Sequence, residues 1–226
     1  MRKKLRIAAV IGLSLLVLAA VGLFVLHMAS QQVPAFYRQA MAMEPAVQRQ
    51  ASDQMLQQAT ALASDLQKEG RWQALFTAEQ INGWLAVDLV ENHPKALPKT
   101  VRDPRVAVSR DRVTLACRFR RGSFSSVLSL TMEPCLPEPN VLALRICKAR
   151  AGLLPVPLGE ILDRISKAAG EANLHVRWRQ VDGDPVVFIT IPPPRNQEKR
   201  GVRIEELRAD PQGIFLAGST ESLSDR

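Results

Sequence analysis

The densest group of side chains able to bind a ligand is a run of seven arginines between residues 102 and 121, with only two aspartates among them. A guanidinium group holds phosphate through two parallel hydrogen bonds. One interpretation is that five of these arginines meet anionic headgroups at a membrane surface. They are Arg105, Arg112, Arg118, Arg120 and Arg121. The alternative is that the run forms a solvated strand face and turn.

Residues suited to catalysis or metal binding are sparse. The sequence has no Gly-x-Ser-x-Gly elbow, no phosphate-binding glycine loop, no His-Glu-x-x-His and no Cys-x-x-Cys. His27, His93 and His175 are interpreted as structural, without acidic or cysteine partners, and Asp182 with Asp184 as part of a turn. We therefore expect no catalysis, cofactor or metal. Because no aromatic ladder lies among the arginines, we also expect no nucleic-acid partner.

Three cysteines, Cys117, Cys135 and Cys147, are separated by 18 and 12 residues, which fits no zinc pattern. Two alternatives stay open. One pair forms a disulfide in an oxidising compartment and leaves the third thiol free, or all three are small buried thiols.

Aliphatic side chains form the second candidate site. The predicted lipid-contacting set takes six residues from strands and three from a helix: Leu115, Leu128, Leu130, Leu142, Leu144, Ile146, Ile161, Leu162 and Ile165. Several strands are apolar on both faces, and such a sheet either has helices over both faces or encloses an apolar ligand. The alternative for the same residues is an ordinary closed core.

The elements that would position these residues follow from the hydrophobic period. From Arg105 the period is two, which predicts a hairpin over 106–119, strands near 128–132 and 142–146, and a proline-rich turn over 134–140. Asp182-Gly183 and 210–213 predict two further hairpin turns, and 158–169 predicts a helix. The expected fold is α+β: a curved, mostly antiparallel sheet of about seven or eight strands with two packed helices.

Two other helices are expected before the sheet. Thr77 and Gln80 have capping-box spacing, so a helix begins near Ala78 and ends before Pro94. Residues 46–69 have one narrow apolar stripe and stop at Gly70. This second helix is either a stalk or self-association helix, or a support packed on the sheet.

Residues 7–26 are twenty uncharged, mostly apolar residues, preceded by the cations Arg2, Lys3, Lys4 and Arg6. A helix of this length reaches about 30 Å, enough for a bilayer's hydrocarbon core. The flanking cations favour a cytoplasmic N-terminus, which places the rest of the chain outside the cytoplasm. A cleaved signal and a buried soluble helix are the alternatives. The expected organisation is 1–29 anchor, 30–70 helical stalk or support, 71–220 extracytoplasmic domain and 221–226 polar tail.

The net charge of the chain favours a modest attraction to anionic surfaces. The chain has 30 basic and 22 acidic residues, and four of the basic ones precede residue 7. The exported part is therefore only mildly basic. Such a surface favours contact with anionic lipid headgroups without requiring nucleic acid.

Three stretches carry a resemblance to known families: FTAEQINGWL at 76–85, the strand rhythm from Pro104 to Phe119, and Gly152 to Leu158 before a helix. Together they resemble the YpmS-like group of single-pass membrane-anchored proteins. The chain is also similar, more distantly, to TULIP-like exported proteins, in which a curved antiparallel sheet holds an acyl chain against a helix. The resemblance implies a membrane-anchored envelope protein that binds a lipid or acyl chain without catalysis. The alternative is an envelope scaffold or protein-interaction module with a closed core.

Overall fold

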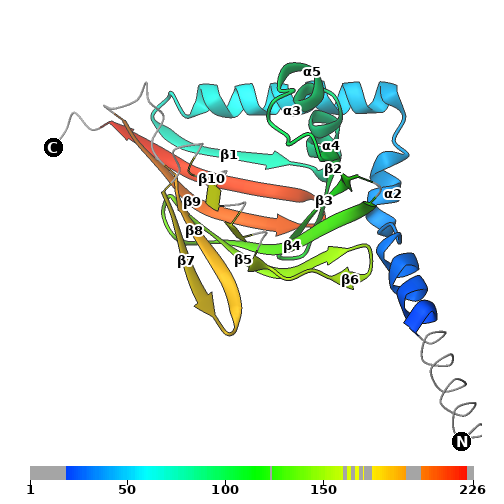
Figure 1. The fold of residues 1–226 in the computed structure, drawn as a ribbon. Helices are drawn as coiled ribbons and strands as arrows, with labels where there is room; N and C mark the ends of the chain where they lie inside the picture. The colour runs from blue at the N-terminus through cyan, green and yellow to red at the C-terminus, as the bar shows by residue number, and fades with distance from the viewer. Residues whose placement is uncertain are drawn as a thin grey trace, which may run out of the picture.

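The computed structural model describes residues 19–122, 124–159, 162–163, 166–167, 170, 175–191 and 200–222. The fold is α+β and its sheets are antiparallel, as predicted (Figure 1). The strands are divided between two sheets, however, where the sequence predicted one. The helices are α2 (Ala35–Met41), α3 (Pro45–Asp65), α4 (Ala78–Ala86) and α5 (Asp88–Asn92), and a further helical segment covers Ala19–Ser30.

The larger sheet has seven strands in the order β2-β3-β4-β5-β8-β7, with β6 paired to β5. Its strands are β2 (Val101–Ser109), β3 (Arg112–Arg121), β4 (Phe124–Glu138), β5 (Val141–Ala151), β6 (Leu154–Pro155), β7 (His175–Val181) and β8 (Asp184–Thr190). The predicted hairpin over 106–119 and the Asp182-Gly183 turn are confirmed.

The smaller sheet has three strands in the order β1-β10-β9: β1 (Gly70–Phe76), β10 (Gly213–Ser222) and β9 (Arg200–Asp210). The turn over 210–213 is confirmed. Strand β1 was not predicted, because its partner β10 lies far along the chain and its short run does not alternate strictly.

Two hairpin turns of the larger sheet hydrogen-bond to β9. The Asp111 N–H donates to the Ala209 carbonyl over 2.8 Å. Asn140 bonds β9 with its side chain, donating to the Val202 carbonyl and accepting from the Ile204 N–H over 2.8 and 2.7 Å. Both turn residues have positive φ, which Asn and Asp tolerate better than most residues. The exposed edge of β9 is thus partly covered, which protects it from pairing with another chain.

The predicted turn over 134–140 is wrong, because β4 continues to Glu138. Pro134 remains opposite Leu144, and the register shifts between Cys135 and Glu138. A proline removes one ladder donor, and an irregular register accommodates that loss. The turn is confined to the two residues after Glu138.

Helix α4 joins the helices to the larger sheet. The capping box of Thr77 and Gln80 is confirmed. Asn82 is buried and brackets Val106 of edge strand β2, with its amide donating to the Val106 carbonyl over 2.8 Å and its oxygen accepting from the Val106 N–H over 2.7 Å. At Gly83 a Cβ would lie 2.6 Å from the Ala51 Cβ of α3, so α3 and α4 cross closely there. Helix α3 runs alongside β1 (Figure 1).

The N-terminal part of the described chain is fastened to the larger sheet. The Ser126 hydroxyl donates to the Ser30 carbonyl over 2.7 Å, and the Leu153 N–H donates to the Ala29 carbonyl over 3.0 Å. The Gln31 amide donates to the Ser125 carbonyl over 2.8 Å. Helix α2 follows, and its buried Tyr37 packs against Ala116 and Val127. We call the contacts of Ala29, Ser30 and Gln31 with β4 and the β5–β6 turn the N-terminal clamp.

No single helix among the described residues is long and apolar enough to cross a membrane. Ala19–Ser30 and α2, bent by 46° at the break between them, reach that length and apolarity only as a pair. Of the predicted span over 7–26, only Ala19 onward lies within the described residues.

Candidate functional site

The six strand residues predicted to contact lipid share one face of the larger sheet. Directly paired residues of antiparallel strands project to the same side, as do alternate residues along one strand. Leu115 is opposite Leu130, and Leu128 lies two residues before Leu130. Met132, on the same side, is opposite Ile146. We call the side formed by Leu115, Leu128, Leu130, Leu142, Leu144 and Ile146 the apolar face.

Burial varies across the apolar face. Ile146 on β5 is 1 % exposed and Val187 on β8, opposite Leu144, is 0 % exposed. Leu128, Leu130, Leu142 and Leu144 are half-buried. Leu115 on β3 is 39 % exposed. Val106, opposite Leu115 on edge strand β2, is again buried at 6 % exposed. The face is therefore closed at Ile146, Val187 and Val106 and open at Leu115, which differs from a core buried throughout.

The predicted helix over 158–169 contributes one described member of the set. Leu162 and Leu158 line a pocket of about 570 Å³ together with Trp178 of β7. Trp178 is opposite Val187, and its indole N–H donates to the Ser166 hydroxyl over 2.7 Å. Leu162 thus lies beside the β7 edge of the apolar face. Ile161 and Ile165 lie outside the described residues.

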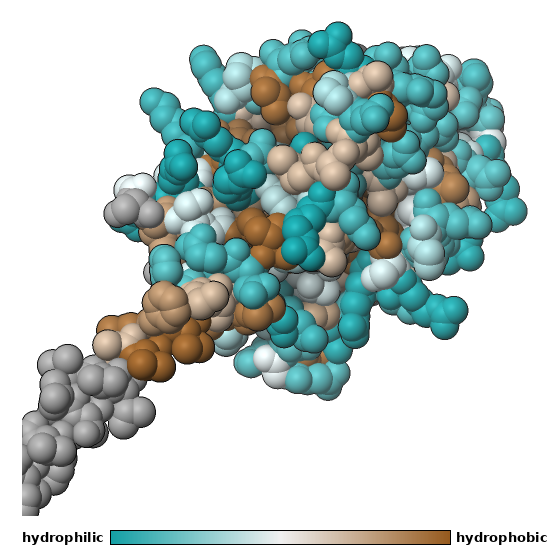
Figure 2. Space-filling view, turned by 90° about the vertical axis from the view of Figure 1, so that its right-hand side faces the viewer, coloured by the Kyte–Doolittle hydropathy of each residue, from teal (hydrophilic) through white to brown (hydrophobic). Residues whose placement is uncertain are grey.

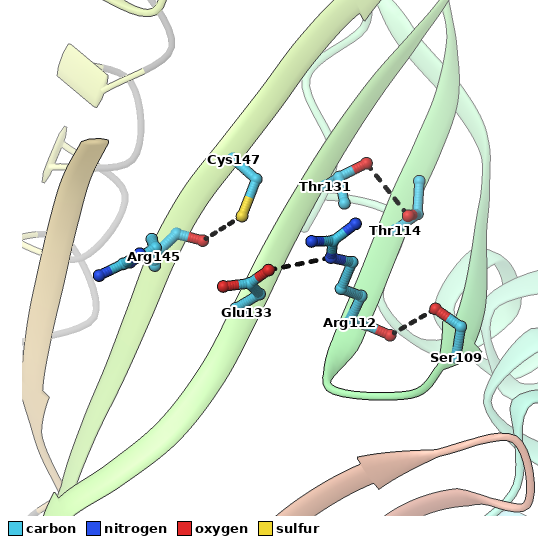
Figure 3. A network of polar contacts seen from close by, with 7 residues as sticks. All are labelled: Ser109, Arg112, Thr114, Thr131, Glu133, Arg145 and Cys147. Carbon is cyan, nitrogen blue, oxygen red and sulfur yellow. Dashed lines mark hydrogen bonds and ion pairs between the residues drawn. The ribbon is translucent and has the colours of Figure 1, made fainter. Parts of the chain in front are cut away.

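The opposite side of the sheet has a polar region beside the buried Ala116 and Val127, which pack against Tyr37. Its rows run across β3, β4 and β5: Thr114 is opposite Thr131, which is opposite Lys148, and Ser129 is opposite Arg150. We call the side formed by Thr114, Ser129, Thr131, Lys148 and Arg150 the polar face. Figure 3 shows its far end, where Arg112 reaches Glu133 over 2.9 Å and the hydroxyls of Thr114 and Thr131 bond over 3.1 Å.

The predicted headgroup arginines do not form one cluster. Arg118, Arg120 and Arg121 lie at the end of β3 next to the N-terminal clamp, since Arg120 is opposite Ser125. Arg112 lies at the other end of β3, eight residues before Arg120. At about 3.4 Å per residue, the two are about 27 Å apart along the strand. Arg112 forms an ion pair with Glu133. Arg118 and Arg120 project to one side of β3 and Arg121 to the other, and Arg118 forms an ion pair with Asp103 over 3.4 Å. Of the five, only Arg118 and Arg120 are therefore placed to share one ligand surface.

Arg105 does not belong to any surface, which corrects the sequence prediction. It is opposite Ala116 beneath α2 and is 5 % exposed. Its Nη1 donates to the Pro104 carbonyl over 2.7 Å, and its Nε has no partner. Burial lowers the pKa of Arg105, while Tyr37 and Asp103 oppose that change. Alternation within one strand could not predict this burial, because Tyr37, which packs on the opposite residue Ala116, comes from a helix far away in the sequence.

The three cysteines are free thiols. Cys117, opposite Leu128 on the apolar face, is half-buried, and burial raises its pKa. Cys147 is half-buried as well, and burial followed by the nearby Glu133 carboxylate raises its pKa. Cys135 is exposed. Neither sequence interpretation holds, since no pair is bridged and one thiol is open to solvent.

His93 has an acidic partner that the sequence analysis missed. Its Nε2 lies 3.5 Å from the Asp88 carboxylate, and the Asn92 amide donates to the same carboxylate over 2.6 Å. Trp84 packs against the imidazole ring. The spacing of five residues between Asp88 and His93 could have indicated this contact from the sequence. Within the described ranges, no group of three or more His, Cys, Asp or Glu side chains could hold a metal ion.

The helical segment Ala19–Ser30 presents large apolar side chains to its surroundings, as Figure 2 shows where the segment leaves the domain. Six of them are between 51 % and 68 % exposed: Val21, Leu23, Phe24, Val25, Leu26 and Met28. Two exposed apolar residues, Phe124 and Leu153, lie on the segments that form the N-terminal clamp. Apolar surface is thus gathered where this segment joins the sheet.

Comparison of the chain with family models, with curated proteins and with solved structures finds no match in any of the three. The YpmS-like and TULIP-like resemblance stays a prediction from the sequence motifs.

Proposed function

We propose that this is a membrane-anchored, extracytoplasmic envelope protein that binds a lipid or acyl chain on the apolar face of its larger sheet, without catalysis. The observation that carries the proposal is the single apolar face, which is open at Leu115 and closed at Ile146. Covering such a face with a hydrocarbon chain contributes about 0.8 kcal/mol for each buried methylene. The resemblance to TULIP-like proteins agrees with this mode of binding.

Membrane attachment is supported by the exposed apolar side chains of Ala19–Ser30 and by the uncharged run that precedes them. Apolar surface of this extent is rare on soluble monomers and marks a membrane or protein contact. The cations before residue 7 favour a cytoplasmic N-terminus for a single span.

The test uses the full chain in phosphatidylcholine nanodiscs with a photoactivatable palmitic acid. We expect crosslinks on β3, β4 and β5 peptides, mapped by mass spectrometry. Leu115→Gln should weaken the apparent affinity about tenfold, since about 1.4 kcal/mol of lost apolar contact corresponds to that factor. Crosslinks confined to residues 19–30 contradict the proposal.

Leu56→Gln is the matched control. Leu56 on α3 is 41 % exposed, against 39 % for Leu115, but it lies away from the apolar face. Both variants replace a leucine of nearly equal exposure with glutamine. Equal losses of binding in both would show that the effect is not specific to the apolar face.

One observation favours the second candidate, an interaction module that docks another protein. Helix α3 presents Val47 and Leu56 to solvent, 36 % and 41 % exposed, on a helix whose length is mostly uncovered. In that case Leu56→Gln reduces capture of an envelope partner from crosslinked cells, whereas Leu115→Gln does not.

A further inference from the structure

A pocket of about 450 Å³ lies on the polar face, on the opposite side of the sheet from the apolar face. Its floor is formed by β3, β4 and β5, and one wall by residues 32–36, which lead from the N-terminal clamp into α2. The pocket is therefore next to the point where the helical segment Ala19–Ser30 joins the domain.

The floor brings two cations and three hydroxyls together. Lys148 and Arg150 are two residues apart on β5 and so project to the same side, and both line the pocket. Ser129 and Thr131 are directly opposite them on β4, and Thr114 follows on β3. The Thr114 and Thr131 hydroxyls bond to each other over 3.1 Å, which keeps both at the pocket floor.

The charge of the pocket is not neutralised by its lining. No acidic side chain lines it, and neither Lys148 nor Arg150 has an acidic partner within the part of the chain that the structure describes. The carboxylate that follows Thr131 on this face, Glu133, is bound by Arg112 over 2.9 Å. The two cations are thus free to take an external anion.

We propose that this pocket binds a phosphate group, held by Lys148 and Arg150 and by the hydroxyls of Thr114, Ser129 and Thr131. Arginine offers two parallel donors to phosphate and lysine a mobile point charge. The wall contributed by Val33, Pro34 and Phe36 is apolar, which suits the organic part of a phosphate ester. The site goes beyond the proposed function, because it lies on the other face and needs no acyl chain on the apolar face.

The phosphate group can come from an anionic phospholipid of the same membrane or from a soluble phosphate. The first source rests on the proposed membrane attachment. One arm of the test places the full chain in nanodiscs of phosphatidylcholine and phosphatidylglycerol at four to one and counts retained phosphatidylglycerol by native mass spectrometry. The other arm titrates inorganic phosphate into the full chain in dodecyl maltoside, followed by ³¹P NMR line width.

The decisive variant is Lys148→Gln with Arg150→Gln. The matched control is Arg71→Gln with Arg203→Gln, which removes the same charge from the smaller sheet, where both arginines are opposite Ser219. We expect the first pair to lose at least fivefold in retained phosphatidylglycerol and the control to match the wild type. Because all four side chains are exposed, stability should change little. The single variants replace the pair if it does not fold.

Binding in the phosphate titration alone, lost in the same variant, assigns the site to a soluble phosphate. No difference between the two pairs in either arm overturns the inference. Palmitate crosslinking to the apolar face should be unchanged in the Lys148 and Arg150 variant, and phosphate binding should be unchanged in Leu115→Gln. The inference and the proposed function can therefore fail independently.

Discussion

The two half-buried thiols and the exposed one should differ sharply in reactivity. The thiolate is the nucleophile, and burial raises the pKa of Cys117 and of Cys147, so both carry little thiolate near neutral pH. Cys135 is open to solvent. We expect iodoacetamide at pH 8 to modify Cys135 first and the others at least tenfold more slowly, measured by peptide mass spectrometry. Equal modification rates for the three cysteines would contradict the burial of Cys117 on β3 and of Cys147 on β5.

Tyr37 should make the fold sensitive to alkali. Burial, followed by the Asp103 carboxylate, raises its pKa above 10.0. As the pH rises past that value, tyrosine in the unfolded chain ionises while folded Tyr37 stays protonated, so the free energy of unfolding falls. Tyr37→Phe should flatten this fall above pH 10.

The same variant also loses the hydrogen bond from the Tyr37 hydroxyl to the Asp103 carbonyl. At neutral pH this should cost about 0.5–1.5 kcal/mol in urea unfolding. Cys117 also titrates in the alkaline range, but it is present in both chains, so the comparison isolates Tyr37. If the free energy of unfolding fell as steeply above pH 10 in Tyr37→Phe as in the wild type, the Tyr37 phenol would not be shielded from solvent.

At the level of elements, the crossing of α3 and α4 depends on Gly83. Gly83→Ala places a Cβ 2.6 Å from the Ala51 Cβ and 2.6 Å from the Ser52 backbone nitrogen. Such overpacking typically costs about 1–3 kcal/mol, more than the helix propensity gained by alanine. Thermal unfolding should show the loss. Ala51→Gly should restore only part of it, because the backbone contact with Ser52 remains.

Elements whose signals are local were predicted well from the sequence. The start of α4 is set by Thr77 and Gln80, three residues apart, and the β7–β8 turn by Asp182 and Gly183. Alternation also predicted that Leu115, Leu128 and Leu130 lie on one side of the sheet, because alternate residues of a strand project to the same side.

Features assembled from distant segments could not be predicted in this way. Arg105 is buried where Tyr37, from a helix far earlier in the chain, packs on the opposite residue Ala116. The pocket that contains Lys148 and Arg150 draws its floor from three strands and one wall from residues 32–36. No local pattern of residues signals either arrangement.

For the whole molecule, the N-terminal clamp should fix how the domain sits relative to the segment Ala19–Ser30. Gly152 has φ +60 and a Cβ there would lie 2.5 Å from the Ala29 carbonyl oxygen; Gly122 has φ +61 and open space around it. Gly152→Ala and Gly122→Ala therefore share the same backbone strain, and only the first collides with the clamp. We expect spin-label distances between residue 24 and β4 to broaden in Gly152→Ala alone.

The clamp also limits how far the domain can reach. The sequence allowed residues 30–70 to be a stalk, but Ala29 to Gln31 bond directly to β4 and the β5–β6 turn, and α2 packs on the same sheet. With the proposed anchor, no spacer separates the bilayer from the domain. The domain would therefore rest on the surface of its own membrane and exchange lipid with that leaflet, rather than span the gap to a second one.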